Sequence, residues 1–158
     1  MSRVYLVRHG QAAFGSDDYD RLTETGIAQC RQLARHWRAI GRHVDLVYCG
    51  TLRRQRESAE AFAQAAVEQG GVALPVQSLA GIEEYDHLAL LAAHLGGGVG
   101  PGEFADRRVA HRRLSAALKA WAAGELPGVE PFPAFRDRCA ATLATVLRDT
   151  GRGRAAVL

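Results

Sequence analysis

The sequence predicts an α/β fold built on a mostly parallel sheet, and three apolar segments support this. The chain opens with an apolar segment at residues 3–8, and a second one, 45–49, follows a helical stretch. Another helical stretch leads to a weaker segment at 72–79. Strands that alternate with helices are typical of parallel sheets with crossover helices. Ligands of such sheets bind at the carboxyl ends of the strands, so function is sought in the residues that follow each strand.

The predicted helices have recognisable ends. The first should begin at Thr23, whose hydroxyl can cap a helix, and should end at Gly41. The second, residues 52–69, is broken by the two glycines that follow it. The apolar stripe of the first helix recurs at helical spacing: Ile27, Cys30, Leu33, Ala34 and Trp37.

The second half of the chain is expected to be mainly helical. Residues 80–95 should form a loop and then a short helix, and the glycine-rich segment 96–102 should have no regular structure. That segment is no phosphate-binding P-loop, because no Gly-Lys-Ser/Thr follows it. Helices are predicted over 103–124 and 133–149, and residues 151–158 read as a turn and the start of another strand.

Composition limits the function classes. The chain has 158 residues, 47% of them hydrophobic and 23% charged, which suits one globular domain. No apolar run approaches the ~20 residues that span a bilayer. The first strand begins too early for a signal peptide, so we expect a cytoplasmic protein without a membrane partner. The net charge of +3 comes from dispersed arginines, which predicts no nucleic-acid partner and is compatible with an anionic substrate.

The three cysteines, Cys30, Cys49 and Cys139, fit no metal-ligand spacing, and their odd number argues against a disulfide framework. We expect buried free thiols. Cys49 ends a predicted strand, so a reactive thiol stays an alternative there.

The first strand runs into Arg8-His9-Gly10. A neutral imidazole can attack phosphorus, and arginine offers a planar fork that matches phosphate oxygens. The glycine would let the backbone approach a ligand closely. The alternative is a core histidine with satisfied hydrogen bonds beside a surface arginine.

Two further motifs follow predicted strands. Arg53, Arg54 and Arg56 lie in the first turn of the second helix, where anions bind favourably; the alternative is a solvated helix face paired with acids. Glu83 and Glu84 follow the third strand, where an acid could protonate a leaving group; the alternative is surface acidity. All three motifs could meet at one crevice.

Residues 6–11 (Leu-Val-Arg-His-Gly-Gln), 22–29 (Leu-Thr-Glu-Thr-Gly-Ile-Ala-Gln) and 52–59 (Leu-Arg-Arg-Gln-Arg-Glu-Ser-Ala) resemble the histidine phosphatase superfamily, also called phosphoglycerate mutase-like. The resemblance covers roughly residues 1–90 and is thin from 91 to 150. It implies one domain over 1–158, a three-layer α/β/α sandwich around a mostly parallel sheet.

The resemblance also implies roles. His9 would be the nucleophile that forms a phosphohistidine, which water then hydrolyses. Arg8 and Arg54 would clamp the phosphoryl oxygens. Glu84 would be the general acid, with Glu83 the alternative.

Substrate binding would involve Gln11, Gly15, Ser16 and Thr23 at the entrance. No metal or other cofactor is implied, because arginines take the role of a cation. The substrate would be a phosphorylated small molecule or a phosphoprotein, and a homodimer stays open.

One departure from the family pattern concerns a second histidine, which family members carry just after a strand near the C-terminus. Here the chain stops at Leu158, where that strand should be starting. One explanation is a C-terminally incomplete domain that lacks the final strand or strands, and this is our expectation. The other is a member that lacks the histidine and an inner strand, which would leave backbone groups of residues 3–8 unpaired.

Function therefore has more than one reading. The first is a metal-independent phosphomonoesterase acting through phosphohistidine. The second is a catalytically impaired member that binds phosphorylated ligands or a protein partner. Mutase-type phosphotransfer ranks lower, because it needs a longer lid to protect the phosphorylated intermediate from water.

Overall fold

The computed structural model describes residues 3–13, 18–100, 106–151 and 153–157. These residues form two compact units. The sheet unit comprises the chain up to Glu83 together with the chain from Ala140 onward, and the helical unit comprises Glu84–Cys139. Each unit is described by itself.

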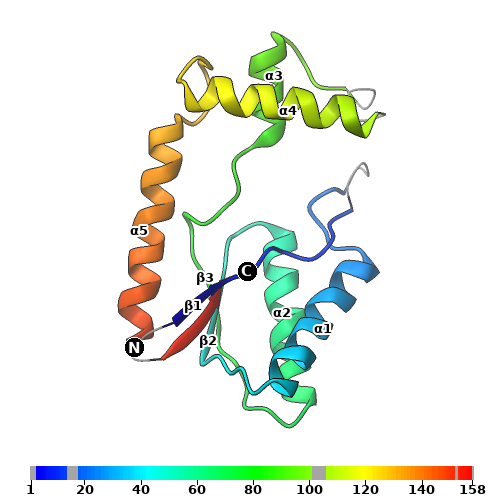
Figure 1. Cartoon of the computed structure of the whole chain (residues 1–158), viewed down its shortest axis with the longest axis vertical. Coiled ribbons are helices and arrows are strands. Elements are labelled where there is room, and N and C mark those ends of the chain that lie inside the picture. Colours follow the sequence, from blue (N-terminus) through cyan, green and yellow to red (C-terminus); the bar gives the residue numbers. More distant parts are fainter. Residues whose placement is uncertain (1–2, 14–17, 101–105, 152, 158) are drawn as a thin grey trace. The chain divides into compact units, whose positions relative to one another are not determined.

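The sheet unit holds four parallel strands (Figure 1). They are β1 (Arg3–Leu6), β2 (Leu46–Cys49), β3 (Val76–Ser78) and β4 (Arg154–Val157), in the order β1-β4-β2-β3. The late strand β4 thus lies between the two early ones and pairs with both. The backbone of β1 is therefore paired with β4 along its whole length. The inner strand that a family member without the second histidine would lack is present.

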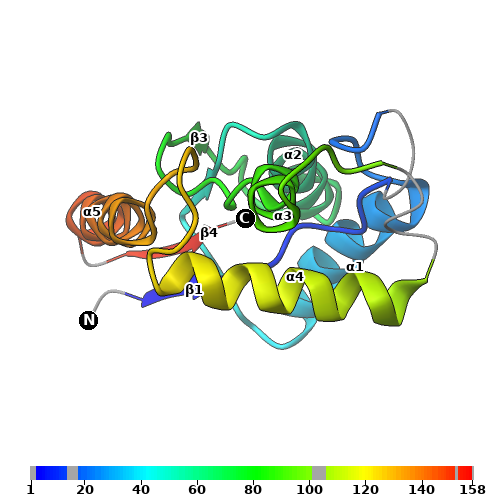
Figure 2. The same cartoon turned by 90° about the horizontal axis from the view of Figure 1, so that it is seen from above.

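Two helices cover one face of this sheet. α1 (Glu24–Ala39) begins where the sequence predicts, and the Thr23 hydroxyl accepts a hydrogen bond from a backbone N–H in its first turn. α2 (Arg53–Glu68) packs beside α1, as both views show (Figures 1 and 2). The core between helices and sheet is built from buried residues of α1, β2 and α2: Ala34, Trp37, Val47, Cys49, Ala59, Phe62 and Ala65.

The opposite face of the sheet is covered by the C-terminal part of α5 (Phe132–Thr150). Tyr48, fully buried, points to this face and packs against Val146, whereas its neighbours Val47 and Cys49 point to α1 and α2. This alternation is the period of two expected for a strand buried on both faces. The predicted three-layer α/β/α arrangement is confirmed.

Two strands are shorter than the sequence predicts by more than one residue. The segment expected at 3–8 leaves the sheet after Leu6, which pairs with Val157, the last described residue of β4. The segment expected at 72–79 contributes only Val76–Ser78. Pro75, which has no N–H, precedes that strand and limits its pairing.

The helical unit contains α3 (His87–Leu95), α4 (Arg107–Ala122) and the start of α5. Asp86 and Asp106 cap the two shorter helices by accepting backbone hydrogen bonds of 2.8–3.3 Å. Four aromatic rings pack together in this unit, from Tyr85, Trp121, Phe132 and Phe135. Within the described ranges, no helix has the length and apolarity needed to cross a membrane.

Candidate active site

The loop after β1 touches the first turn of α1 through two glycines. A Cβ added to Gly10 would lie 2.4 Å from the carbonyl oxygen of Gly26, and one added to Gly26 would lie 2.3 Å from the carbonyl oxygen of Gln11. Real Cβ atoms do not approach backbone so closely, so both positions require glycine. The glycines of the first two motifs are thus the contact that joins them.

Hydrogen bonds fix the loop at Gln11. Its carbonyl oxygen accepts bonds from the N–H and the hydroxyl of Thr23, at 2.9 and 3.1 Å, and its N–H donates to Oε1 of Gln29 at 2.9 Å. Because the Thr23 hydroxyl also accepts from Gly26, it is engaged within the loop. Substrate binding by Gln11 and Thr23 stays a prediction, and Gly15 and Ser16 lie outside the described residues.

His9 has a defined tautomer in this setting. Its Nδ1 lies 2.7 Å from the carbonyl oxygen of Gly10, and a carbonyl can only accept, so Nδ1 carries the proton. The other ring nitrogen, Nε2, accepts a 3.3 Å hydrogen bond from Nε of Arg54. A lone pair on Nε2 is what a nucleophilic imidazole needs.

Arg54 reaches His9 from the first turn of α2. The residue is only 5% exposed, yet it carries a charge, and its Nη1 pairs with Oδ1 of Asp20 at 2.6 Å. Ser58, one turn further along α2, donates to the Arg54 carbonyl at 2.7 Å and accepts from the N–H of Gly10 at 3.0 Å. Helix α2 therefore positions both the arginine and the glycine beside the histidine.

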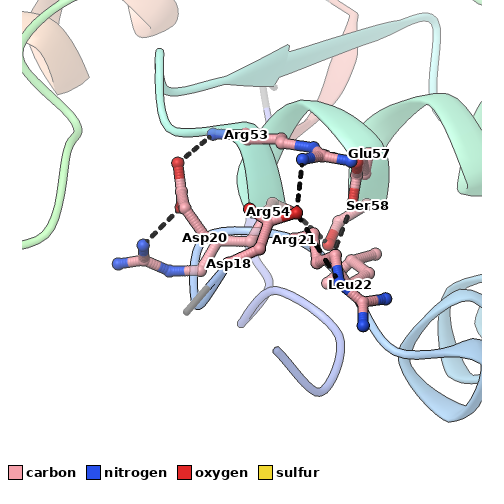
Figure 3. Close-up of polar contacts among 8 residues, drawn as sticks. All are labelled: Asp18, Asp20, Arg21, Leu22, Arg53, Arg54, Glu57 and Ser58. Atoms are coloured by element: carbon pink, nitrogen blue, oxygen red, sulfur yellow. Dashed lines mark hydrogen bonds and ion pairs between the residues drawn. The ribbon is translucent and has the colours of Figure 1, made fainter. Parts of the chain in front are cut away.

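A network of carboxylates surrounds this helix start (Figure 3). Asp20 accepts from the backbone N–H of Arg53 at 2.8 Å, and the Arg53 guanidinium binds Asp18 at 2.9 Å and Glu57 at 2.6 Å. Glu57 also accepts from the N–H of Leu22 at 2.7 Å. Burial alone would raise the pKa of Glu57, but the bonds from Leu22 and Arg53 hold it below its ordinary value.

Residues 4–158 match the family model of the histidine phosphatase superfamily (branch 1). The chain belongs to this superfamily. No curated protein matches the sequence significantly.

Solved structures share the fold of this histidine phosphatase superfamily chain. A phosphoglycerate mutase from Bacillus anthracis str. Sterne is 18% identical, with a TM-score of 0.62, over 98% of this chain and 73% of that chain. The α-ribazole phosphatase from Shigella flexneri is 20% identical, with a TM-score of 0.61, over 98% and 72%. A mycobacterial glucosyl-3-phosphoglycerate phosphatase is 17% identical, with a TM-score of 0.61, over 96% and 70%. The predicted phosphoglycerate mutase-like fold is confirmed.

Glu83 is held firmly in this superfamily member. Its carboxylate accepts from the hydroxyl and N–H of Thr51, at 2.7 and 3.2 Å, and from the N–H of Gly81 at 2.6 Å. Burial would raise its pKa, but these hydrogen bonds lower it below the ordinary value. Glu84 begins the helical unit, whereas Glu83 ends the sheet unit.

The other arginines of the motifs, unlike Arg54, are exposed. Arg8 is exposed, and Arg56 points from an exposed position of α2. Arg53 is engaged by Asp18 and Glu57. Of the residues predicted to be catalytic, the structure brings His9 and Arg54 into direct contact.

Asp20 and Ser58 belong to this site although neither was predicted from the sequence, and Asp20 is the one that contacts the Arg54 guanidinium. No helix or strand period relates a loop residue to an arginine 34 positions later. The one signal in the sequence is its place just before the Leu22-Thr23 motif.

In the part of the chain that the structure describes, no three His, Cys, Asp or Glu side chains gather as metal ligands would. Cys30 and Cys49 are buried and Cys139 is half-buried, and none of the three is in a disulfide. Burial raises the pKa of the Cys49 thiol, which works against the alternative of a reactive thiol.

Proposed function

We propose that this protein is a phosphomonoesterase that works through a phosphohistidine on His9. The observation that carries the proposal is the pairing of the His9 Nε2 lone pair with the buried guanidinium of Arg54, 3.3 Å away. One group can attack phosphorus, and the other can stabilise the charge that builds on the phosphoryl oxygens. Family membership supports the same chemistry.

The reaction would proceed in two displacements. First, Nε2 of His9 forms a bond to phosphorus while the ester P–O bond breaks, and the leaving alkoxide takes a proton from an acid. Water then attacks phosphorus and gives a proton to the carboxylate that the acid has become, the N–P bond breaks, and inorganic phosphate leaves with His9 restored. Arg54, with Arg8 as the second clamp, would hold the phosphoryl oxygens in both steps.

We assign the role of acid to Glu84 rather than Glu83. A general acid must hold a proton at the working pH, and a raised pKa favours this. Glu83 has a lowered pKa because Thr51 and Gly81 donate hydrogen bonds to its carboxylate. These bonds give Glu83 a role in joining two loops of the sheet unit.

The substrate we propose is a phosphorylated small molecule. Two structures of the same fold are named for such activities, an α-ribazole phosphatase and a glucosyl-3-phosphoglycerate phosphatase. The two arginines would supply the positive charge that the mechanism needs, so we propose that no metal takes part.

A second histidine remains a prediction from the family resemblance. Matching structures are covered to 70–73% of their length by this chain.

The test of the proposed function uses p-nitrophenyl phosphate and alkaline quenching, since phosphohistidine is labile in acid. Wild-type protein should release p-nitrophenol and show a transient phosphohistidine. His9→Ala should abolish both, whereas His43→Ala, an exposed histidine outside the site, should retain them. If His9→Ala kept activity within about tenfold of wild type, His9 would be ruled out as the nucleophile, because a tenfold change in rate is only about 1.4 kcal/mol of activation free energy. Phosphate binding without turnover would favour the ligand-binding alternative.

A further inference from the structure

Arg54 poses a positional problem that its own helix does not solve. An arginine side chain has many rotamers, and this one is buried, with 6% of the side chain exposed. A buried charge is stable only when it is paired and hydrogen-bonded. The first turn of α2 also lacks a cap from its own N-cap residue, because the side chain of Leu52 cannot accept a hydrogen bond from the N–H groups of that turn.

Asp20 answers both needs with one carboxylate. Its Oδ1 accepts from Nη1 of Arg54 at 2.6 Å, and its Oδ2 accepts from the N–H of Arg53 at 2.8 Å (Figure 3). The second bond serves the first turn of α2 as a cap supplied by a distant loop. The side chain and the backbone that carries it are thus held by the same group.

The loop that carries Asp20 is itself tied to the site. The N–H of Leu22 donates to Glu57 of α2, and the N–H of Ala13 donates to the carbonyl of Arg21. The ring of Tyr19 lies 5.4 Å from the guanidinium carbon of Arg54. Asp20 therefore has a defined position from which it can orient the arginine.

We propose that Asp20 is a positioning residue that holds the Arg54 guanidinium in one orientation. In this orientation Nε donates to His9 and Nη1 donates to Asp20. This rests on the proposed function of His9 and Arg54. Asp20 adds negative charge near an anionic substrate, so it cannot favour ground-state binding. Its contribution should appear in kcat, because a clamp displaced by about 1 Å costs on the order of 100-fold in rate.

The experiment compares Asp20→Ala with Asp18→Ala, a matched control in the same loop. Asp18 binds the exposed guanidinium of Arg53 and has 54% of its side chain exposed. With p-nitrophenyl phosphate, Asp20→Ala should lower kcat by about 10- to 100-fold and leave KM within about threefold. Asp18→Ala should stay within about twofold of wild type. Asp20→Asn, which keeps one acceptor oxygen, should restore part of kcat.

A double-mutant cycle separates positioning from a merely structural role. If Asp20 acts through Arg54, then Asp20→Ala should cost little further activity when Arg54 is already alanine. A helix cap that matters only for folding would cost the same in both backgrounds. Equal losses in the two backgrounds would overturn the proposal, and so would an unchanged kcat in Asp20→Ala.

A readout without turnover keeps this inference separate from the proposed function. In ¹⁵N-labelled protein, the Nε–H resonance of Arg54, assigned by its loss in Arg54→Ala, should shift or broaden in Asp20→Ala and stay in place in Asp18→Ala. If wild-type protein has no phosphatase activity, the proposed function fails while this resonance still tests the positioning. An Arg54 resonance that is unchanged in Asp20→Ala would refute it.

Discussion

Replacing Gly10 by alanine tests the contact that joins the histidine loop to α1. The new methyl group would lie 2.4 Å from the carbonyl oxygen of Gly26, whereas ordinary contact begins at 3.4 Å, so the two backbone segments must separate by about 1 Å. Overpacking of this kind costs about 1–3 kcal/mol. The same displacement strains the 3.0 Å bond from Gly10 N–H to Ser58, worth about 1 kcal/mol.

The expected loss is therefore about 2–4 kcal/mol in the free energy of unfolding of the sheet unit. Urea unfolding followed by tryptophan fluorescence, to which the buried Trp37 of the sheet unit contributes, measures it. Gly98→Ala is the control, because a Cβ at Gly98 meets no atom within 4 Å, and it should stay within about 0.5 kcal/mol of wild type.

Gly26→Ala, whose new Cβ would lie 2.3 Å from the carbonyl oxygen of Gln11, should behave like Gly10→Ala. A loss below about 0.5 kcal/mol in Gly10→Ala, or an equal loss in Gly98→Ala, would refute the argument that these backbones are in contact.

Three further predictions follow from the site. Arg54→Ala should cost about 3 kcal/mol or more of transition-state stabilisation, which would lower kcat/KM by at least about 100-fold. Arg56→Ala, at an exposed position of the same helix, should change kcat/KM little, and equal losses in the two variants would contradict the role of Arg54. The pKa of Glu57 is lowered in the folded state, so its contribution to stability is present at neutral pH and is lost as the pH falls through the acidic range. Glu57→Gln should therefore make the free energy of unfolding depend less on pH in that range, and an unchanged pH profile would contradict this prediction. Phosphatase activity should survive dialysis against EDTA, and loss that is restored by a divalent metal would refute the metal-free mechanism.

The sequence could predict those parts of the molecule that rest on local patterns. The helix that starts after Thr23 was predicted from a capping hydroxyl and an apolar stripe, and both act within a few residues. The strand at β2 was predicted because continuous apolar residues are typical of a strand buried on both faces. The contact of His9 with Arg54 was expected because each follows a strand of a parallel sheet.

Other features depend on partners far away in the sequence. The extent of β1 could not be predicted from its own residues, because its pairing partner, β4, lies far away in the sequence. The role of Asp20 depends on a loop that folds back onto α2, and no local sequence pattern predicts that contact. Glu83 and Glu84 read alike in sequence, whereas in the structure Glu83 accepts a hydrogen bond from Thr51, which lies 32 positions earlier in the chain.

The strand order has a consequence for how the site is assembled over time. β1, which leads to His9, and β2, which leads to Arg54, are each paired to β4 rather than to each other. Contacts between such distant parts of a chain form slowly, because the loop they close must be ordered first. As the chain leaves the ribosome, the two early strands must wait for a late one before His9 and Arg54 are held in register. Synthesis of the late strand thus sets the earliest moment at which this sheet can hold the two side chains together.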